Sequence, residues 1–219
     1  MSDVLPLPEA EEQSEPHTPS EVRSILERWH ITERDLTAAI DENPSLRGML
    51  LGYVAEYKLR TMWFAGRPGV TYYVKHDDHN RKKKGDLVVT YKGVLFAVES
   101  KSLQTNSIQK VGDAWVGKAQ CDASDRRKVN FADGTSLETT CLLTGEFDIL
   151  AVNRFAFEHD WRFIFAKNKD LPRSRFRKYS EIQRAALLAS SVPVSWPPQP
   201  PFRDEPFSLM DELMREKAS

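Results

Sequence analysis

The pattern of hydrophobic positions changes its period near residue 70. Before that point, polar caps precede short segments with helical character, which predicts helices beginning at Ser20 and Thr32. A longer helix is predicted over 45–64, and Gly66 and Pro68 end it. The chain therefore begins its ordered part with helices.

After residue 70, β-branched and aromatic residues dominate, as is typical of strands. Three strands are predicted, over 70–76, 86–91 and 94–100. Lys92 and Gly93 separate the second strand from the third, and a two-residue connection ending in Gly indicates a hairpin turn. The second and third strands are therefore expected to pair directly.

The remaining chain alternates helical and strand patterns. It predicts a helix over 110–129, strands within 139–157 and 161–168, a helix capped by Ser180 over 180–191, a Pro-rich connector over 192–206, and a small amphipathic helix over 208–217. The order of helices and strands indicates an α/β fold with a mixed central β-sheet flanked by helices and with additional N-terminal helices.

Composition divides the chain into three parts. Residues 1–19 are rich in Pro, Glu and Ser and predict a disordered acidic tail, 20–190 form the main domain with a core over 45–168, and 191–219 hold the Pro-rich connector and C-terminal helix. The tail carries five acidic and no basic residues, so the rest of the chain holds all 31 basic residues against 27 of the 32 acidic ones. This small basic excess is a weak indication of a polyanionic partner.

Two features bear on the cellular compartment. Cys121 and Cys141 form neither a CxxC pair nor a disulfide framework, which fits a reducing cytosol. No apolar run approaches 18 residues, and the N-terminus has no signal-peptide core. A soluble cytoplasmic protein without a membrane segment is expected.

Charged residues at the ends of the predicted hairpin form the candidate site. Glu99 and Lys101 share one face of a strand, about 7 Å apart, and Asp86 opens the preceding strand. Two carboxylates at one sheet end repel each other unless a cation lies between them, and Mg²⁺ favours one or two carboxylates. The alternative is a solvated strand end in which Glu99 pairs with Lys101 and Asp86 caps a turn.

The spacing Asp86-x12-Glu99-Ser100-Lys101 resembles the PD-(D/E)XK nuclease superfamily, which has the restriction-endonuclease-like fold. The resemblance covers residues 45–168 and includes the type II restriction endonucleases. It implies Mg²⁺-dependent phosphodiester hydrolysis, with Mn²⁺ able to substitute, in which Asp86 and Glu99 bind the metal and Lys101 polarises the attacking water. Gly85 stands where the motif has its proline, and Ser100 where an apolar residue is common.

Two further residues are candidates for the same site. Glu56 lies on the mainly apolar stripe of the third helix, where an unpaired carboxylate is costly. The resemblance implies that Glu56 is a third metal ligand, while a salt bridge to Arg60 is the structural alternative. Gln120, on the helix predicted after Lys101, resembles the glutamine that some superfamily members place beside the site; an exposed helical glutamine is the alternative.

Three clusters of basic residues indicate a surface that follows a nucleic-acid backbone. They are Arg81, Lys82, Lys83 and Lys84; Arg126, Arg127 and Lys128; and Lys167, Lys169, Arg173, Arg175, Arg177 and Lys178. Each cluster taken alone is more typical of a solvated charged surface. The segment HDDHN, residues 76–80, collects metal-ligand residue types but is interpreted as a solvated connector.

The leading functional hypothesis is a Mg²⁺-dependent DNA endonuclease of the restriction type. Such an enzyme is expected to cut duplex DNA as a homodimer and to have a cognate DNA methyltransferase encoded nearby. The alternatives are a homing, junction-resolving or repair nuclease of the same superfamily, or a non-catalytic nucleic-acid-binding protein on this scaffold.

Overall fold

The computed structural model describes residues 23–74 and 85–218. The predicted acidic tail, the cap at Ser20, the 76–80 segment and the basic residues 81–84 lie outside the described residues. The chain divides into two compact units, residues 1–48 and 49–219, and each is described by itself. Among the described residues, no helix is long and apolar enough to cross a membrane.

The first unit contains two short helices, α1 (Ile25–Trp29) and α2 (Glu33–Asp41). Ser24 caps α1 and Thr32 caps α2, and each side-chain oxygen accepts a hydrogen bond from the backbone N–H three residues later, at 3.2 Å. The predicted cap at Thr32 is confirmed, whereas α1 begins later than the predicted first helix.

The long helix predicted over 45–64 is confirmed. It consists of α3 (Pro44–Leu59), which continues directly into the π-helical turn η1 (Arg60–Phe64). Ala55, Leu59 and Phe64 are its buried residues.

A five-stranded sheet with the order β1–β2–β3–β8–β9 forms the centre of the second unit. Its strands are β1 (Val70–Val74), β2 (Leu87–Tyr91), β3 (Val94–Ser102), β8 (Ile149–Asn153) and β9 (Phe163–Lys167). Of the four pairs of neighbouring strands, three are antiparallel, and the pair of β3 and β8 is parallel. The predicted α/β fold with a mixed central sheet is confirmed.

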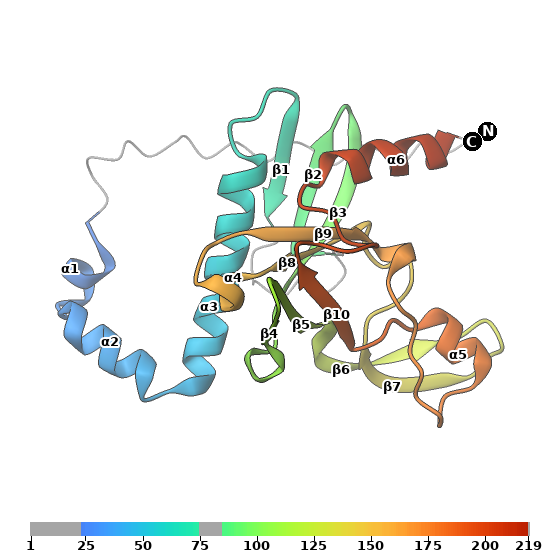
Figure 1. Cartoon of the computed structure of the whole chain (residues 1–219), viewed down its shortest axis with the longest axis horizontal. Helices are drawn as coiled ribbons and strands as arrows, with labels where there is room; N and C mark the ends of the chain where they lie inside the picture. The colour runs from blue at the N-terminus through green and yellow to red at the C-terminus, as the bar shows by residue number, and fades with distance from the viewer. Residues whose placement is uncertain (1–22, 75–84, 219) are drawn as a thin grey trace, which may run out of the picture. The chain divides into compact units, whose positions relative to one another are not determined.

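The two faces of this sheet are covered differently. Phe96 and Val98 of β3 point into a core formed with Leu59, Phe64 and helix α6 (Phe207–Ala218). On the opposite face, Leu150 and Val152 of β8 pack against residues of a second, smaller sheet. Figure 1 shows α3 and α6 on the outside of the central strands, with β10, β5 and β4 below them.

The second sheet replaces a predicted helix. The segment 110–129 contains most of β4 (Gln109–Val111), all of β5 (Ala114–Gln120) and most of β6 (Asp122–Asn130), so the helix prediction is wrong. Lys118 and Gln120 are exposed while Gly117 and Ala119 are buried, which is the two-residue period of a strand. Gly112, at a φ of +60°, and Asp113 form the turn that pairs β4 with β5.

The C-terminal region also belongs to the packed structure. Within the predicted connector, β10 (Ser191–Trp196) pairs with β5, and Val192 and Val194 join the core. Residues 155–157, predicted as strand, belong to the helical turn α4 (Phe155–Glu158). The predicted cap at Ser180 is confirmed at the start of α5 (Glu181–Ala186), which lies beside the hairpin of β6 and β7 (Ser136–Cys141) (Figure 1).

Candidate active site

The register of the β2–β3 hairpin places Asp86 beside Glu99. The turn residues Lys92 and Gly93 both have positive φ, 50° and 77°, as the tight two-residue turn requires. Leu87 pairs with Val98, and the Asp86 N–H donates to the Val98 carbonyl at 3.0 Å, so the pairing extends to Asp86 and Glu99. The predicted hairpin is therefore confirmed, and its register brings Asp86 next to Glu99.

Asp86 is held in place by the backbone of the neighbouring strand. Its Oδ2 accepts a hydrogen bond from the Ser100 N–H at 2.8 Å. This bond fixes one carboxylate oxygen and leaves Oδ1 without a hydrogen bond among the described residues. Asp86 is therefore positioned by β3, the strand that also carries Glu99.

Strand alternation separates the charged side chains from the helix-covered core. Phe96 and Val98 are fully buried under α3 and α6, so Glu99 and Lys101 extend from the other face of β3. The Lys101 Nζ lies 2.9 Å from Glu99 Oε1, and the two side chains are only 19% and 12% exposed. They form a largely buried ion pair rather than a solvated strand end.

The charges of Asp86, Glu99 and Lys101 influence one another. Burial, followed by the negative charge of Asp86, raises the pKa of the Glu99 carboxyl to about 7, against the opposing effect of Lys101. Burial alone would lower the pKa of Lys101, but the carboxylates of Glu99 and Asp86 outweigh it and the pKa is raised. Two carboxylates thus compete for one ammonium group.

A second ion pair lies near the first, and sequence reasoning missed it. Both Arg127 terminal nitrogens donate to the Glu146 carboxylate, and Glu146 also accepts the Leu143 N–H at 2.8 Å. The charge of Glu146 is close enough to contribute to the raised pKa of Glu99. No sequence signal joins a residue of β6 to the loop before β8, because the contact depends on how the second sheet folds.

Cys121 is another neighbour of the site. It is fully buried at the end of β5, and burial raises the pKa of its thiol to about 12 in spite of the nearby Lys101. A thiol with this pKa stays protonated near neutral pH and is a poor nucleophile. Cys121 therefore forms part of the apolar wall beside Lys101.

Glu56 and Gln120 are the two further residues that the resemblance implied for the site. Among residues 23–74 and 85–218, no group of three or more His, Cys, Asp or Glu side chains is arranged to hold a metal ion, and the role of Glu56 stays a prediction. Gln120 is exposed on β5, and its side chain alternates with those of Ala119 and Cys121, which are buried. The predicted helix that would have carried Gln120 is absent from this segment.

The basic residues predicted to bind DNA also differ in their availability. Arg126, Lys128 and Arg175 are exposed. Arg127 is engaged by Glu146, and the Arg173 guanidinium donates to the backbone carbonyls of Leu171 and Lys169 at 2.7 and 2.9 Å. Arg127 and Arg173 therefore have structural partners, while the other three present their charge to solvent.

Comparisons with known proteins add one distant similarity. No family model matches the chain, and no curated protein matches it. Among solved structures, the chain is similar to a bacterial homing endonuclease, I-Ssp6803I, with 16% sequence identity and a TM-score of 0.35. The alignment covers 64% of this chain and 87% of that one. At this distance, the function has to be inferred from the residues of the site itself.

Proposed function

We propose that this protein is a metal-dependent DNA endonuclease that hydrolyses phosphodiester bonds, with an active site formed by Asp86, Glu99 and Lys101. One observation carries the proposal: two carboxylates and an ammonium group come together on the buried side of a hairpin end, with Glu99 and Lys101 2.9 Å apart. Burying such a group costs free energy, so its retention favours a chemical role over a structural one.

The donor atoms fit a hard divalent cation. Asp86 and Glu99 offer carboxylate oxygens, and the repulsion between them, which contributes to the raised pKa of Glu99, is relieved by a bound cation. Mg²⁺ commonly binds through one or two carboxylates and completes its coordination with water and phosphate oxygens, and Mn²⁺ is expected to substitute. When bound, the metal would supply Lewis-acid activation of the phosphate and of a water molecule.

The protein's own residues have separate roles in this proposal. The Ser100 N–H holds Asp86 in a fixed orientation at 2.8 Å. The Lys101 ammonium, held against Glu99, donates hydrogen bonds to the attacking water and stabilises negative charge that develops on the phosphate. Glu56 and Gln120 stay predictions from the superfamily resemblance and are not part of the proposed metal set.

The proposed substrate is DNA, and the first choice within the nucleases is a restriction-type enzyme that cuts duplex DNA. Exposed Arg126, Lys128 and Arg175 are available to neutralise phosphates. The basic run 81–84 leads directly into Asp86 in the sequence and supports the same assignment. A homodimer and a cognate methyltransferase are the partners that a restriction enzyme implies.

The substrate class is tested by incubating the protein and Mg²⁺ with duplex, branched and single-stranded DNA of matched sequence. Preferential cleavage of duplex DNA supports the restriction-type assignment, whereas preference for a four-way junction favours a junction-resolving nuclease. Salt-sensitive DNA binding without cleavage, together with no heat of Mg²⁺ binding by calorimetry, would replace the proposal with a non-catalytic binding protein.

A further inference from the structure

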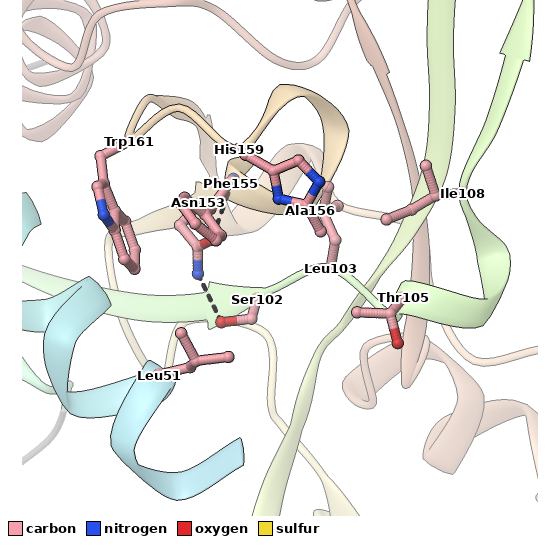
Figure 2. Close-up of a pocket in the computed structure, with 10 residues that line it drawn as sticks. All are labelled: Leu51, Ser102, Leu103, Thr105, Ile108, Asn153, Phe155, Ala156, His159 and Trp161. Carbon is pink, nitrogen blue, oxygen red and sulfur yellow. Dashed lines mark hydrogen bonds between the residues drawn. The ribbon is translucent and has the colours of Figure 1, made fainter. Parts of the chain in front are cut away.

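A cavity of about 490 Å³ opens where the parallel strands β3 and β8 end (Figure 2). Its size is typical of small-molecule sites, and the crevice beyond the carboxyl ends of parallel strands is a common place for ligands. The ten residues that line it are Leu51, Ser102, Leu103, Thr105, Ile108, Asn153, Phe155, Ala156, His159 and Trp161. They include no Lys, Arg, Asp or Glu, so the cavity favours a neutral ligand.

Aromatic rings form one wall of the cavity. The rings of Phe155 and Trp161 are stacked with centroids 4.5 Å apart and an interplanar angle of 25°. The His159 ring meets Phe155 edge-on at 5.6 Å. Figure 2 shows Trp161 on one side of the cavity and the aliphatic Leu51 of α3 below it. Flat aromatic surfaces of this kind favour a planar ligand that can stack.

Polar groups lie at the strand ends. The Asn153 side chain is only 5% exposed; its Nδ2 donates to Ser102 Oγ at 2.5 Å, and its Oδ1 accepts the Phe155 N–H at 3.3 Å (Figure 2). Because an amide group has two N–H donors and a hydroxyl group has one, one hydrogen of Asn153 and the hydrogen of Ser102 stay available to a ligand. The cavity thus combines stacking surfaces with hydrogen-bond donors.

The cavity adjoins the proposed cleavage site along β3. The side chains of Lys101 and Ser102 point to opposite faces of β3, but Leu103, which also lines the cavity, shares the face of Lys101. Cα atoms two residues apart along a strand are separated by about 7 Å. A nucleotide whose phosphate lies at Lys101 therefore has its base within reach of the cavity. A phosphate is a poor occupant of the cavity itself, because the lining residues carry no Lys or Arg. A nucleobase is planar and neutral and carries hydrogen-bonding edges, so it matches the lining.

We propose that this cavity binds one unstacked nucleobase of the strand whose phosphate lies at Asp86, Glu99 and Lys101, an inference that rests on the proposed function. The base stacks on the free face of the stacked Trp161–Phe155 pair, and its polar edge accepts hydrogen bonds from Ser102 and Asn153. The protein thus distinguishes a strand that can extrude a base beside the cleaved bond from one that cannot.

The test compares binding to two fluorescent single strands in EDTA by anisotropy. One strand carries ordinary bases, and the other has the same number of phosphates but abasic sites throughout, so electrostatic attraction is matched. Wild type is expected to bind the base-containing strand more tightly, and Trp161→Ala to weaken that binding by roughly tenfold or more without changing abasic binding. Thr105→Phe, which fills the cavity from an exposed position, is expected to act in the same way if Trp161→Ala does not fold. Tyr72→Ala, an exposed aromatic residue on β1, is the control.

The possible results separate this inference from the proposed function when wild-type cleavage with Mg²⁺ is measured in parallel. If wild type cleaves DNA but its binding shows no base preference, or one that does not change at Trp161 or Thr105, the inference is overturned and the proposed nuclease function stands. If the base preference depends on these two positions but wild type does not cleave DNA, the proposed nuclease function is overturned and the cavity remains a nucleobase site. Equal effects of Tyr72→Ala and Trp161→Ala would overturn the cavity as the place of binding.

Discussion

The backbone of Gly85 has a φ of +74°, a conformation that L residues rarely adopt. Proline, whose ring fixes φ near −65°, cannot adopt this conformation, whereas glycine adopts it readily. A Cβ at Gly85 would also lie 3.1 Å from the Val98 carbonyl oxygen. The glycine lets the chain turn into Asp86 while keeping it against β3.

Gly85→Ala is predicted to destabilise the protein and to displace Asp86. The expected loss in unfolding free energy is about 1–3 kcal/mol, measured by urea titration, with a parallel loss of cleavage. Gly69→Ala is the matched control, because Gly69 has nearly the same φ, +73°, but open space around its Cβ position. Equal losses for both variants, with cleavage unchanged, would show that the contact with Val98 has no influence on the site.

The raised pKa of Glu99 gives the metal-free protein a pH dependence. Because the folded pKa, about 7, exceeds the ordinary value of 4.5, the folded state binds the proton more tightly and its stability falls as pH rises between these values. In EDTA, wild type is expected to lose on the order of 1–3 kcal/mol between pH 4.5 and 8 relative to Glu99→Gln. Chemical denaturation at several pH values measures this difference; parallel pH profiles for the two proteins would contradict the assigned pKa.

At the residue scale, the sequence was sufficient to predict that Asp86, Glu99 and Lys101 lie close together. Strand alternation and a recognisable turn bring them together, and both are local properties. The partnership of Arg127 with Glu146 was not predictable, because it joins β6 to a distant loop. Arg127 therefore read as a free basic residue although its guanidinium is engaged.

At the element scale, the least predictable part was the segment 110–129. Trp115, Gly117 and Ala119 alternate with Val116 and polar residues, a pattern that fits strand β5. Ala, Lys and Gln are good helix formers, and their propensity favoured a helix. Pairing of β5 with both β4 and β10 overrides that preference, and β10 comes from sequence more than 70 residues later.

Helix α6 is attached to the central sheet by a cluster of ion pairs. Glu212 accepts hydrogen bonds from Lys167 of β9 at 2.7 Å and from Arg203 at 2.6 Å. These two bonds lower the pKa of Glu212 to about 2. Arg203 also exchanges backbone hydrogen bonds with Phe165, so the segment before α6 is joined to β9 as well.

Glu212→Gln is predicted to destabilise the protein in a pH-dependent way. Because the folded pKa is below 4.5, the stabilisation is present above about pH 4.5 and is lost as pH falls toward 2. The variant is expected to lose about 1 kcal/mol at pH 7 and less at pH 3, measured by denaturant titration. Glu138→Gln, at an exposed position on β7, is the control. A difference that is constant from pH 7 to 3 would contradict the role of the carboxylate charge.

At the scale of the whole molecule, the crossover between β3 and β8 determines where the site lies. Two parallel strands require a long connection, and residues 103–148 supply it as β4 to β7 rather than as the usual helix. This connection covers the face of β3 that carries Glu99 and Lys101, while α3 and α6 cover the other. Sequence patterns predicted the mixed sheet, but they could not predict this connection because its pairings are long-range.

The restriction-type proposal predicts a homodimer, since each protomer supplies one site and duplex cleavage requires two cuts. Sedimentation equilibrium is expected to give twice the mass of the chain at assay concentrations. A monomer that still makes double-strand breaks in a single binding event would contradict this arrangement and favour another class of nuclease.

The most direct test of the central claim is the initial rate of supercoiled plasmid cleavage with Mg²⁺ for wild type, Asp86→Asn, Lys101→Met and the control Lys118→Met, an exposed lysine on β5. Wild type and the control are expected to cleave at similar rates and to stop in EDTA. Asp86→Asn, which keeps an oxygen for the Ser100 N–H, and Lys101→Met are expected to be slower by about 10²-fold or more. Undiminished cleavage by either variant, or no cleavage by wild type, would contradict a nuclease site at Asp86, Glu99 and Lys101.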